Sequence, residues 1–295
     1  MKIYKYIIVL SFLCLWLNSF IPPNVLYMLG LFSILSFGIL HGANDIVIIS
    51  KSFKVFKDSN IYKLIIFYLT FVSLFAIFFV FFPDFALLIF ILISAYHFGE
   101  QHWEKILKSS SNYLKIPYYL IYGSVIFCLI FYFHQERVET IINNICGYFV
   151  NLDFLKYVLG VLIFLIVAFS VYFNRTNRLF RLQLTEQLLY ILVLAIIFRT
   201  TDLIWSFAIY FVLWHSIPSL NDQLKYIYGD STKKSILIYL KQSVLYWLIS
   251  IIGLFAFYWF LKDTKIFEAL LFSFIAAITF PHVLVISKMF RNHKN

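Results

Sequence analysis

The chain has 295 residues, of which 62% are hydrophobic and only 13% are charged, and its mean hydropathy is +0.88. Soluble globular domains carry about 25% charged residues, so this composition excludes an ordinary soluble domain. The formal net charge of +10 is compatible with a nucleic-acid-binding protein. Lys and Arg also gather on the cytoplasmic loops of membrane proteins, however, and their positions along the chain decide between the two explanations.

Apolar runs of about 18 residues or more recur along the whole chain, which is typical of transmembrane helices. We therefore predict an all-α fold, a polytopic transmembrane helical bundle of about ten spans, in which residues 1–295 form a single integral-membrane domain. Charges and turn residues divide the chain into ten predicted helices, at 4–21, 24–41, 61–82, 84–100, 113–134, 154–173, 182–199, 202–217, 236–261 and 265–288.

The Lys and Arg residues indicate how these spans are oriented. If the N-terminus lies inside, 19 of the 24 basic residues fall on the inner side and five on the outer side. The positive-inside rule then predicts that both termini are cytoplasmic. Membrane orientation accounts for the basic excess, so no nucleic-acid partner is expected. We expect a multi-pass protein of the plasma (inner) membrane, surrounded by the lipid bilayer.

Four of the seven histidines lie towards the inner ends of predicted helices that run from outside to inside. These are His41, His97, His215 and His282, and the next Lys follows each of them after six to ten residues. At a rise of about 1.5 Å per residue, the four imidazoles are expected at one depth in the inner leaflet.

A single histidine inside a membrane can simply make a hydrogen bond between helices. Ionisable side chains in the bilayer are costly and usually functional, however, and neutral imidazole is the commonest metal ligand. Four histidines at one depth therefore favour a metal site, suited to Fe, Zn, Cu or Ni. Two alternatives remain open at this point, namely a proton relay or transport site and purely structural hydrogen bonding.

Two carboxylates accompany these histidines. Asp45 follows His41 by four residues and Glu100 follows His97 by three, so each can share a helical face with its histidine. A carboxylate in that position can orient an imidazole through its second N–H, as is usual around metal ligands. The alternative is that both are interfacial carboxylates that face cytoplasmic water.

Two further side chains lie close to the histidines in sequence. Trp214 directly precedes His215, which makes it a candidate supporting residue. His102 follows His97 by five residues, about 140° further round a continuous helix. His102 can therefore join the other histidines only if the helix breaks at Gly99, and we treat it as a minor candidate ligand.

The motifs "HGANDI", "SAYHFGE", "LWHSIPS" and "FPHVLV", in this order across a polytopic chain, resemble the Brp/Blh family of bacterial and archaeal β-carotene 15,15′-dioxygenases. The resemblance implies an enzyme of carotenoid catabolism and retinal biosynthesis. It would cleave the central double bond of β-carotene with O2 at non-haem Fe²⁺, and its two retinal products commonly serve microbial rhodopsins. It also implies that His41, His97 and His215 are iron ligands, while His282 matches a Pro-His of the family.

The chain departs from the family in its third motif. The family usually has W-H-x-x-R-H, whereas residues 214–219 read "WHSIPS", so Ser219 stands where a second histidine is expected. The missing ligand is then expected from His282 or, as an alternative, from His102. Two other functions remain open: a transporter or proton relay that uses the inner-leaflet histidines, and a non-catalytic relative that binds carotenoid or retinal.

Overall fold

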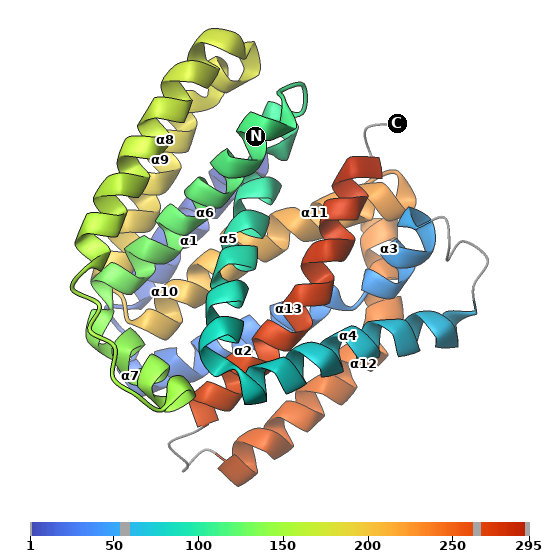
Figure 1. Cartoon of the computed structure of the whole chain (residues 1–295). Helices are drawn as coiled ribbons and strands as arrows, with labels where there is room; N and C mark the ends of the chain where they lie inside the picture. Colours follow the sequence, from blue (N-terminus) through green and yellow to red (C-terminus); the bar gives the residue numbers. More distant parts are fainter. Residues whose placement is uncertain (1, 54–59, 262–266, 293–295) are drawn as a thin grey trace. The chain divides into compact units, whose positions relative to one another are not determined.

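The computed structural model describes residues 2–53, 60–261 and 267–292, and these residues form helices joined by short connections, with no strand among them (Figure 1). In chain order the helices are α1 (Lys2–Leu17), α2 (Pro23–Gly42), α3 (Asp45–Ser52), α4 (Ile61–Phe81), α5 (Pro83–Leu107), α6 (Asn112–Phe133), α7 (Gln135–Cys146), α8 (Leu155–Thr176), α9 (Arg178–Thr200), α10 (Leu203–Ile209), the π-helix η2 (Tyr210–Ser216), α11 (Ile217–Tyr228), α12 (Lys233–Leu261) and α13 (Phe267–Asn292).

The prediction of an all-α polytopic helical bundle is confirmed. Among the described residues, eight helical segments are long and apolar enough to cross a membrane, and α1 is apolar but shorter. The eight segments are Pro23–Ser52, Tyr62–Phe81, Pro83–Leu107, Asn112–Phe133, Leu155–Thr176, Arg178–Thr200, Leu203–Tyr228 and Ser273–Asn292. All ten helices predicted from the sequence correspond to a helix of the structure, including α1 and α12.

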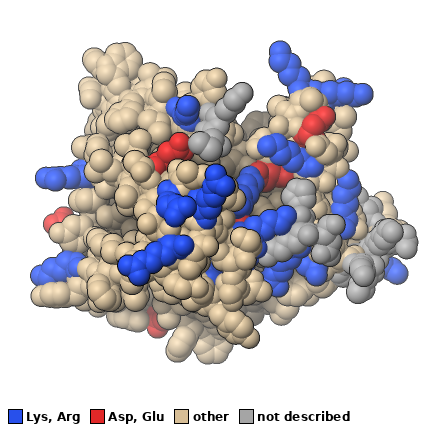
Figure 2. Space-filling model, turned by 90° about the horizontal axis from the view of Figure 1, so that it is seen from above, with Lys and Arg blue, Asp and Glu red and all other residues tan. Residues whose placement is uncertain are grey.

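The orientation of these spans stays a prediction. More Lys and Arg than Asp and Glu are visible in Figure 2, in keeping with the basic excess of the whole sequence. Five of the basic residues counted for the orientation lie outside the described residues, namely Lys54, Lys57, Lys262, Lys265 and Lys294.

Two predicted boundaries were wrong in an informative way. The helix expected to end near residue 100 continues as α5 to Leu107. The helix can continue through this charged stretch because the buried Glu104 forms an ion pair with Lys115 of α6 at 2.9 Å. The helix expected over 202–217 is divided into α10 and the π-helix η2, after which the chain continues directly as α11.

Local sequence signals explain several helix ends. The side chain of Asn60 accepts a hydrogen bond from the backbone N–H of Tyr62 and thereby caps α4. Asn177 caps α9 in the same way through the N–H of Phe180. Such caps satisfy backbone donors that have no partner within the first helical turn. At the end of α11, Gly229 adopts a φ of 86°, a left-handed conformation that glycine reaches without a steric cost.

The contacts divide the chain into two compact units. Unit 1 comprises Met1–Ile34, Ile91–Thr140 and Phe149–His215, and unit 2 comprises Leu35–Phe90, Ile141–Tyr148 and Ser216–Asn295. The single domain expected from the sequence stays a prediction.

Within unit 1, α6 packs against α8 and α9, and α1 and α10 both contact α9. Helix α5 meets α6 at two glycines. A Cβ on Gly99 would lie 1.9 Å from the carbonyl oxygen of Tyr119, and a Cβ on Gly123 would lie 1.8 Å from that of Ala95. The two backbones therefore touch, which only glycine permits, and close helix contacts through small residues are typical of membrane bundles.

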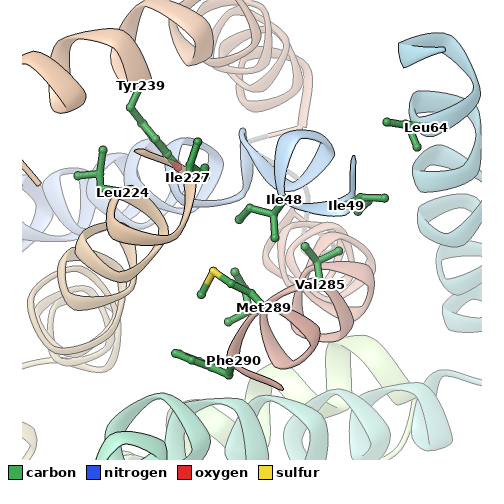
Figure 3. Packing of buried hydrophobic residues seen from close by; sticks show 10 residues of the cluster. Ile48, Ile49, Leu64, Leu224, Ile227, Tyr239, Val285, Met289 and Phe290 are labelled. Carbon is green, nitrogen blue, oxygen red and sulfur yellow. The ribbon is translucent and has the colours of Figure 1, made fainter. Parts of the chain in front are cut away.

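Within unit 2, α13 packs against α3 and α4, and α11 contacts α3 and α12. A cluster of buried side chains joins these helices, and it includes Ile48 and Ile49 of α3, Leu224 of α11 and Met289 of α13 (Figure 3). This packing holds the first residues of α3 against the middle of α13, which matters for the site described next.

Candidate metal centre

Two of the four predicted histidines form a close pair within unit 2. His41 lies in the last turn of α2, and His282 lies in α13 directly after Pro281. Their Nε2 atoms are 2.7 Å apart, and their ring centroids are separated by 4.4 Å with an interplanar angle of 62°. Both side chains are buried, with 3% and 5% of their surface exposed. We call them the unit 2 pair.

Asp45 hydrogen-bonds to Nδ1 of His282, the outer ring nitrogen, which faces away from His41. The Nδ1 atom of His282 lies 2.9 Å and 3.0 Å from the two carboxylate oxygens of Asp45, and the hydroxyl of Tyr68 donates to Oδ2 of the same carboxylate at 2.9 Å. Asp45 was expected to orient His41 instead, and that pairing was wrong. Helix α2 ends at Gly42 and Asp45 begins α3, so the spacing of four residues does not place the carboxylate beside His41 on one helix.

Gln223 lies at the outer side of His41. Its side-chain Nε2 is 3.3 Å from Nδ1 of His41 and 3.0 Å from the carbonyl oxygen of His41. The hydroxyl of Tyr239 lies 2.9 Å from Oε1 of Gln223 and 3.2 Å from the carbonyl oxygen of Leu40. Gln223 is completely buried. Each ring of the unit 2 pair thus has its inner nitrogen facing the other ring and its outer nitrogen beside a polar side chain.

The other two histidines form a second pair within unit 1. His97 lies in α5 and His215 lies in η2, and their ring centroids are 4.9 Å apart at 76°. Both are buried, with 1% and 2% exposed. The ring of His215 also lies 4.6 Å from that of Phe98 and 5.5 Å from that of Phe211. We call His97 and His215 the unit 1 pair.

The π-helix sets the position of His215. The wider turn of a π-helix is uncommon and is frequent at functional sites. The side chain of Gln101 donates to the carbonyl oxygen of His215 at 2.8 Å, and this contact ties η2 to α5. Trp214, expected to support His215, donates through its indole N–H to the hydroxyl of Ser11 at 2.9 Å and packs against Tyr190.

Two other predicted site residues are placed within unit 1. Glu100 is only 3% exposed, so it does not face water, and its carboxylate accepts a hydrogen bond from the hydroxyl of Tyr96 at 2.6 Å. Helix α5 runs without a break through Gly99. The break that would have turned His102 towards the other histidines is therefore absent, and His102 instead hydrogen-bonds to Gln187.

Ser219 lies in α11 and is completely buried. Within the described part of the chain its hydroxyl has no hydrogen-bond partner. The position that carries a histidine in the family motif is thus enclosed by other side chains.

The histidines have the donor chemistry for a metal ion, and within unit 2 the rings of His41 and His282 bring two such donors together in a buried place. Two ligands bound to one ion at about 2.0–2.2 Å have nitrogens roughly 3 Å apart, which the Nε2 atoms of the unit 2 pair approach. A carboxylate on the outer nitrogen of a histidine is the usual support for a metal ligand. The residues present therefore fit a metal site.

Sequence reasoning missed Gln223, Tyr239 and Tyr68. Tyr68 and Tyr239 are two of 21 tyrosines, and no local pattern separates them from the others. Gln223 follows His215 by eight residues in the polar stretch "SLNDQLK", which reads as the end of a span. A buried glutamine in this stretch is recognisable only once α11 is known to continue the helical path.

Comparison with known proteins gives one positive result. A family model described as beta-carotene 15,15′-dioxygenase matches residues 32–290. No curated protein and no solved structure matches the chain.

Proposed function

Because the chain belongs to the family of β-carotene 15,15′-dioxygenases over residues 32–290, we propose that it cleaves the central double bond of β-carotene with O2 and releases two molecules of retinal. The observation that carries this proposal is the arrangement of Asp45, His282 and His41, a carboxylate-supported pair of buried histidines in a membrane-type helical fold.

The metal site is proposed to combine the two histidine pairs around one Fe²⁺ ion. Its ligands would be His41, His97, His215 and His282, the four histidines that the sequence predicts at one depth of the membrane. Histidine ligands suit non-haem iron, and bound Fe²⁺ would supply the site at which O2 is activated. His282 then takes the place of the histidine that the family carries where this chain has Ser219.

The protein's own residues prepare the ligands for this role. Asp45 accepts the Nδ1–H of His282, so that the Nε2 lone pair of this ring points towards His41. Tyr68 donates to the carboxylate and fixes its orientation in turn. Glu100, at three residues from His97, is proposed to support the unit 1 pair in a similar way, with Trp214 and Ser219 as further candidates.

The proposed substrate, β-carotene, suits a site inside a membrane. β-Carotene is a long apolar polyene that dissolves in the bilayer, so a site among membrane-spanning helices receives it without extraction into water. We propose that the protein resides in the plasma membrane, and that its retinal is handed over to a rhodopsin.

The test is expression in a β-carotene-producing, retinal-free bacterium, with retinal and bound iron measured in parallel. The proposal expects retinal from the parent chain and none from His41→Ala or His97→Ala. A parent chain that binds carotenoid or retinal tightly but forms no retinal would instead identify a non-catalytic relative.

One observation favours a second candidate. Asp45, His282, His41 and Gln223 form a continuous series of hydrogen bonds in unit 2. Such series can relay protons, so a transporter or proton relay is the alternative function. Proton uptake into proteoliposomes by a chain that forms no retinal would support it.

A further inference from the structure

Gln223 lies beside His41, a ligand of the proposed metal site, and what we infer for Gln223 rests on that proposed site. Gln223 is a buried side chain with contacts on both ends of its amide. Its Nε2 group can only donate hydrogen bonds, whereas its Oε1 can only accept them. The orientation of the amide therefore decides whether Nδ1 of His41 must donate or accept a hydrogen bond.

As the structure stands, Nε2 of Gln223 faces His41, and the hydroxyl of Tyr239 faces Oε1. His41 Nδ1 consequently accepts a hydrogen bond, and a neutral imidazole that accepts at Nδ1 carries its proton on Nε2. That proton lies on the 2.7 Å contact with Nε2 of His282, whose own proton is on Nδ1 facing Asp45. All five side chains have matching donors and acceptors in this arrangement.

The same arrangement is incompatible with a metal ion on His41. A metal at Nε2 requires the lone pair of this nitrogen, so the ring proton must be on Nδ1, where it needs an acceptor. Turning the Gln223 amide by half a turn places Oε1 beside Nδ1 and provides that acceptor.

In its present orientation Nε2 of Gln223 also donates to the carbonyl oxygen of His41 at 3.0 Å, and the turn gives up this hydrogen bond in exchange for one from the Nδ1–H of His41 to Oε1. After the turn, Nε2 of Gln223 would donate to the hydroxyl oxygen of Tyr239, and the Tyr239 O–H would donate to the carbonyl oxygen of Leu40, already 3.2 Å away. We propose that Gln223 and Tyr239 form a two-state hydrogen-bond switch that holds the ring of His41 in its metal-free form and, with the amide turned, in its metal-binding form. Gln223 is thus a positioning residue for the metal.

The unit 2 pair is then supported unequally. Asp45 is fixed as an acceptor for His282 in both states, whereas Gln223 changes from donor to acceptor for His41. An ionised glutamate at position 223 would accept permanently, as Asp45 does. A methionine there keeps the approximate volume and removes both hydrogen bonds.

The experiment is a titration of the purified full chain in nanodiscs with Co²⁺ alone, without oxygen or substrate. The d–d absorption of bound Co²⁺ gives the dissociation constant and reports the ligands. Loss of a supporting partner of a metal ligand costs about 10–100-fold in affinity. We expect that weakening for Gln223→Met, a smaller weakening for Tyr239→Phe, and affinity at least equal to that of the parent for Gln223→Glu.

A second readout follows the switch directly. Infrared difference spectra of the parent with and without Co²⁺ should contain a shifted side-chain amide carbonyl band that Gln223→Met removes. The matched control is Gln187→Met, which alters a buried glutamine that hydrogen-bonds to His102 of unit 1. It should leave both the Co²⁺ affinity and the band unchanged.

Three results would overturn the proposal: no band that depends on Gln223, unchanged affinity in Gln223→Met, or an equal loss in Gln223→Met and Gln223→Glu, which would mean that Gln223 only packs. Failure of the proposed function looks different. A parent chain that binds Co²⁺ and shows the band but forms no retinal would remove the dioxygenase and keep the switch.

Discussion

The two histidine pairs are equally buried but are held by different kinds of surroundings. The unit 2 pair has polar side chains on its outer nitrogens, from Asp45 and Gln223. Around the unit 1 pair, the aromatic rings of Phe98 and Phe211 lie against His215, and Gln101 binds the backbone rather than the ring. Hydrogen bonds from polar side chains orient the first pair, and aromatic packing and a backbone contact help to position the second.

This difference predicts how each pair responds to mutation. Where hydrogen bonds orient a ring, a substitution that preserves volume should lower metal affinity and leave stability nearly unchanged. Where packing and helix contacts position a ring, the damaging changes should be those that separate helices.

Removal of a ligand should have the largest effect in either pair. His41→Ala, His97→Ala and His215→Ala should each lower retinal formation by about two orders of magnitude or more and reduce bound iron, because each removes one of the four proposed ligand nitrogens. Retinal in membranes and iron in purified protein are measured together.

His134→Ala is the control for these variants. His134 hydrogen-bonds to Ser206 in unit 1 and should affect stability only slightly and retinal not at all. Robust retinal from a variant with His41, His97 and His215 all changed to Ala would contradict the dioxygenase assignment.

The next effect tests the helix contact that supports His97. Gly99→Ala should destabilise the protein by about 1–3 kcal/mol or more, because its Cβ would meet the Tyr119 carbonyl at 1.9 Å and push α5 away from α6. The thermal midpoint in detergent measures this change. Gly160→Ala, where the added Cβ meets nothing within 4 Å, should be neutral or slightly stabilising. Equal midpoints for the two variants would disprove the close contact.

For the unit 2 pair, Asp45→Asn should weaken metal binding about tenfold or more while the thermal midpoint stays close to that of the parent. The amide keeps the shape of the carboxylate but loses the charge that strengthens its hydrogen bond with His282. Metal titration and thermal unfolding on the same preparation separate the two effects.

Asp153→Asn provides the comparison for Asp45→Asn. This residue lies in an exposed connection, where it hydrogen-bonds to Gln135 and Asn151, and the change should leave metal affinity unchanged. An unaltered affinity in Asp45→Asn as well would mean that the carboxylate does not support a ligand.

The smallest effect is expected from restoring the family motif. Ser219→His should not raise iron content or retinal formation, because His282 already pairs with His41. The larger ring also enters a site that is completely buried, and overpacking of this kind costs about 1–3 kcal/mol. A clear gain in bound iron would show instead that the serine leaves the site incomplete.

The helices were predictable because long apolar runs leave few alternatives, and the segments that became α4, α6 and α8 needed no tertiary information. The end of α5 was not predictable. In the sequence, Glu104 and Lys115 look like residues that face water, and only the structure shows that they form an ion pair. The π-helix at His215 was also hidden, since a shift in backbone hydrogen bonding leaves no clear trace in composition.

At the candidate site, the residue types were predictable but their partners were not. The histidines stood out because ionisable side chains are rare in apolar runs. Asp45 was singled out for its closeness in sequence to His41, yet its partner His282 lies 237 positions further along the chain. Only the folding of α3 against α13 brings these two together, and sequence spacing carries no record of that contact.

The central proposal is that both histidine pairs hold the same ion, and iron stoichiometry tests it most directly. The purified chain, loaded with Fe²⁺ without oxygen, should contain about one iron per chain. His282→Ala from the unit 2 pair and His97→Ala from the unit 1 pair should each lose that iron almost completely. If one of these variants keeps a full iron while the other loses it, or if the parent binds two, the pairs do not share an ion and the account is wrong.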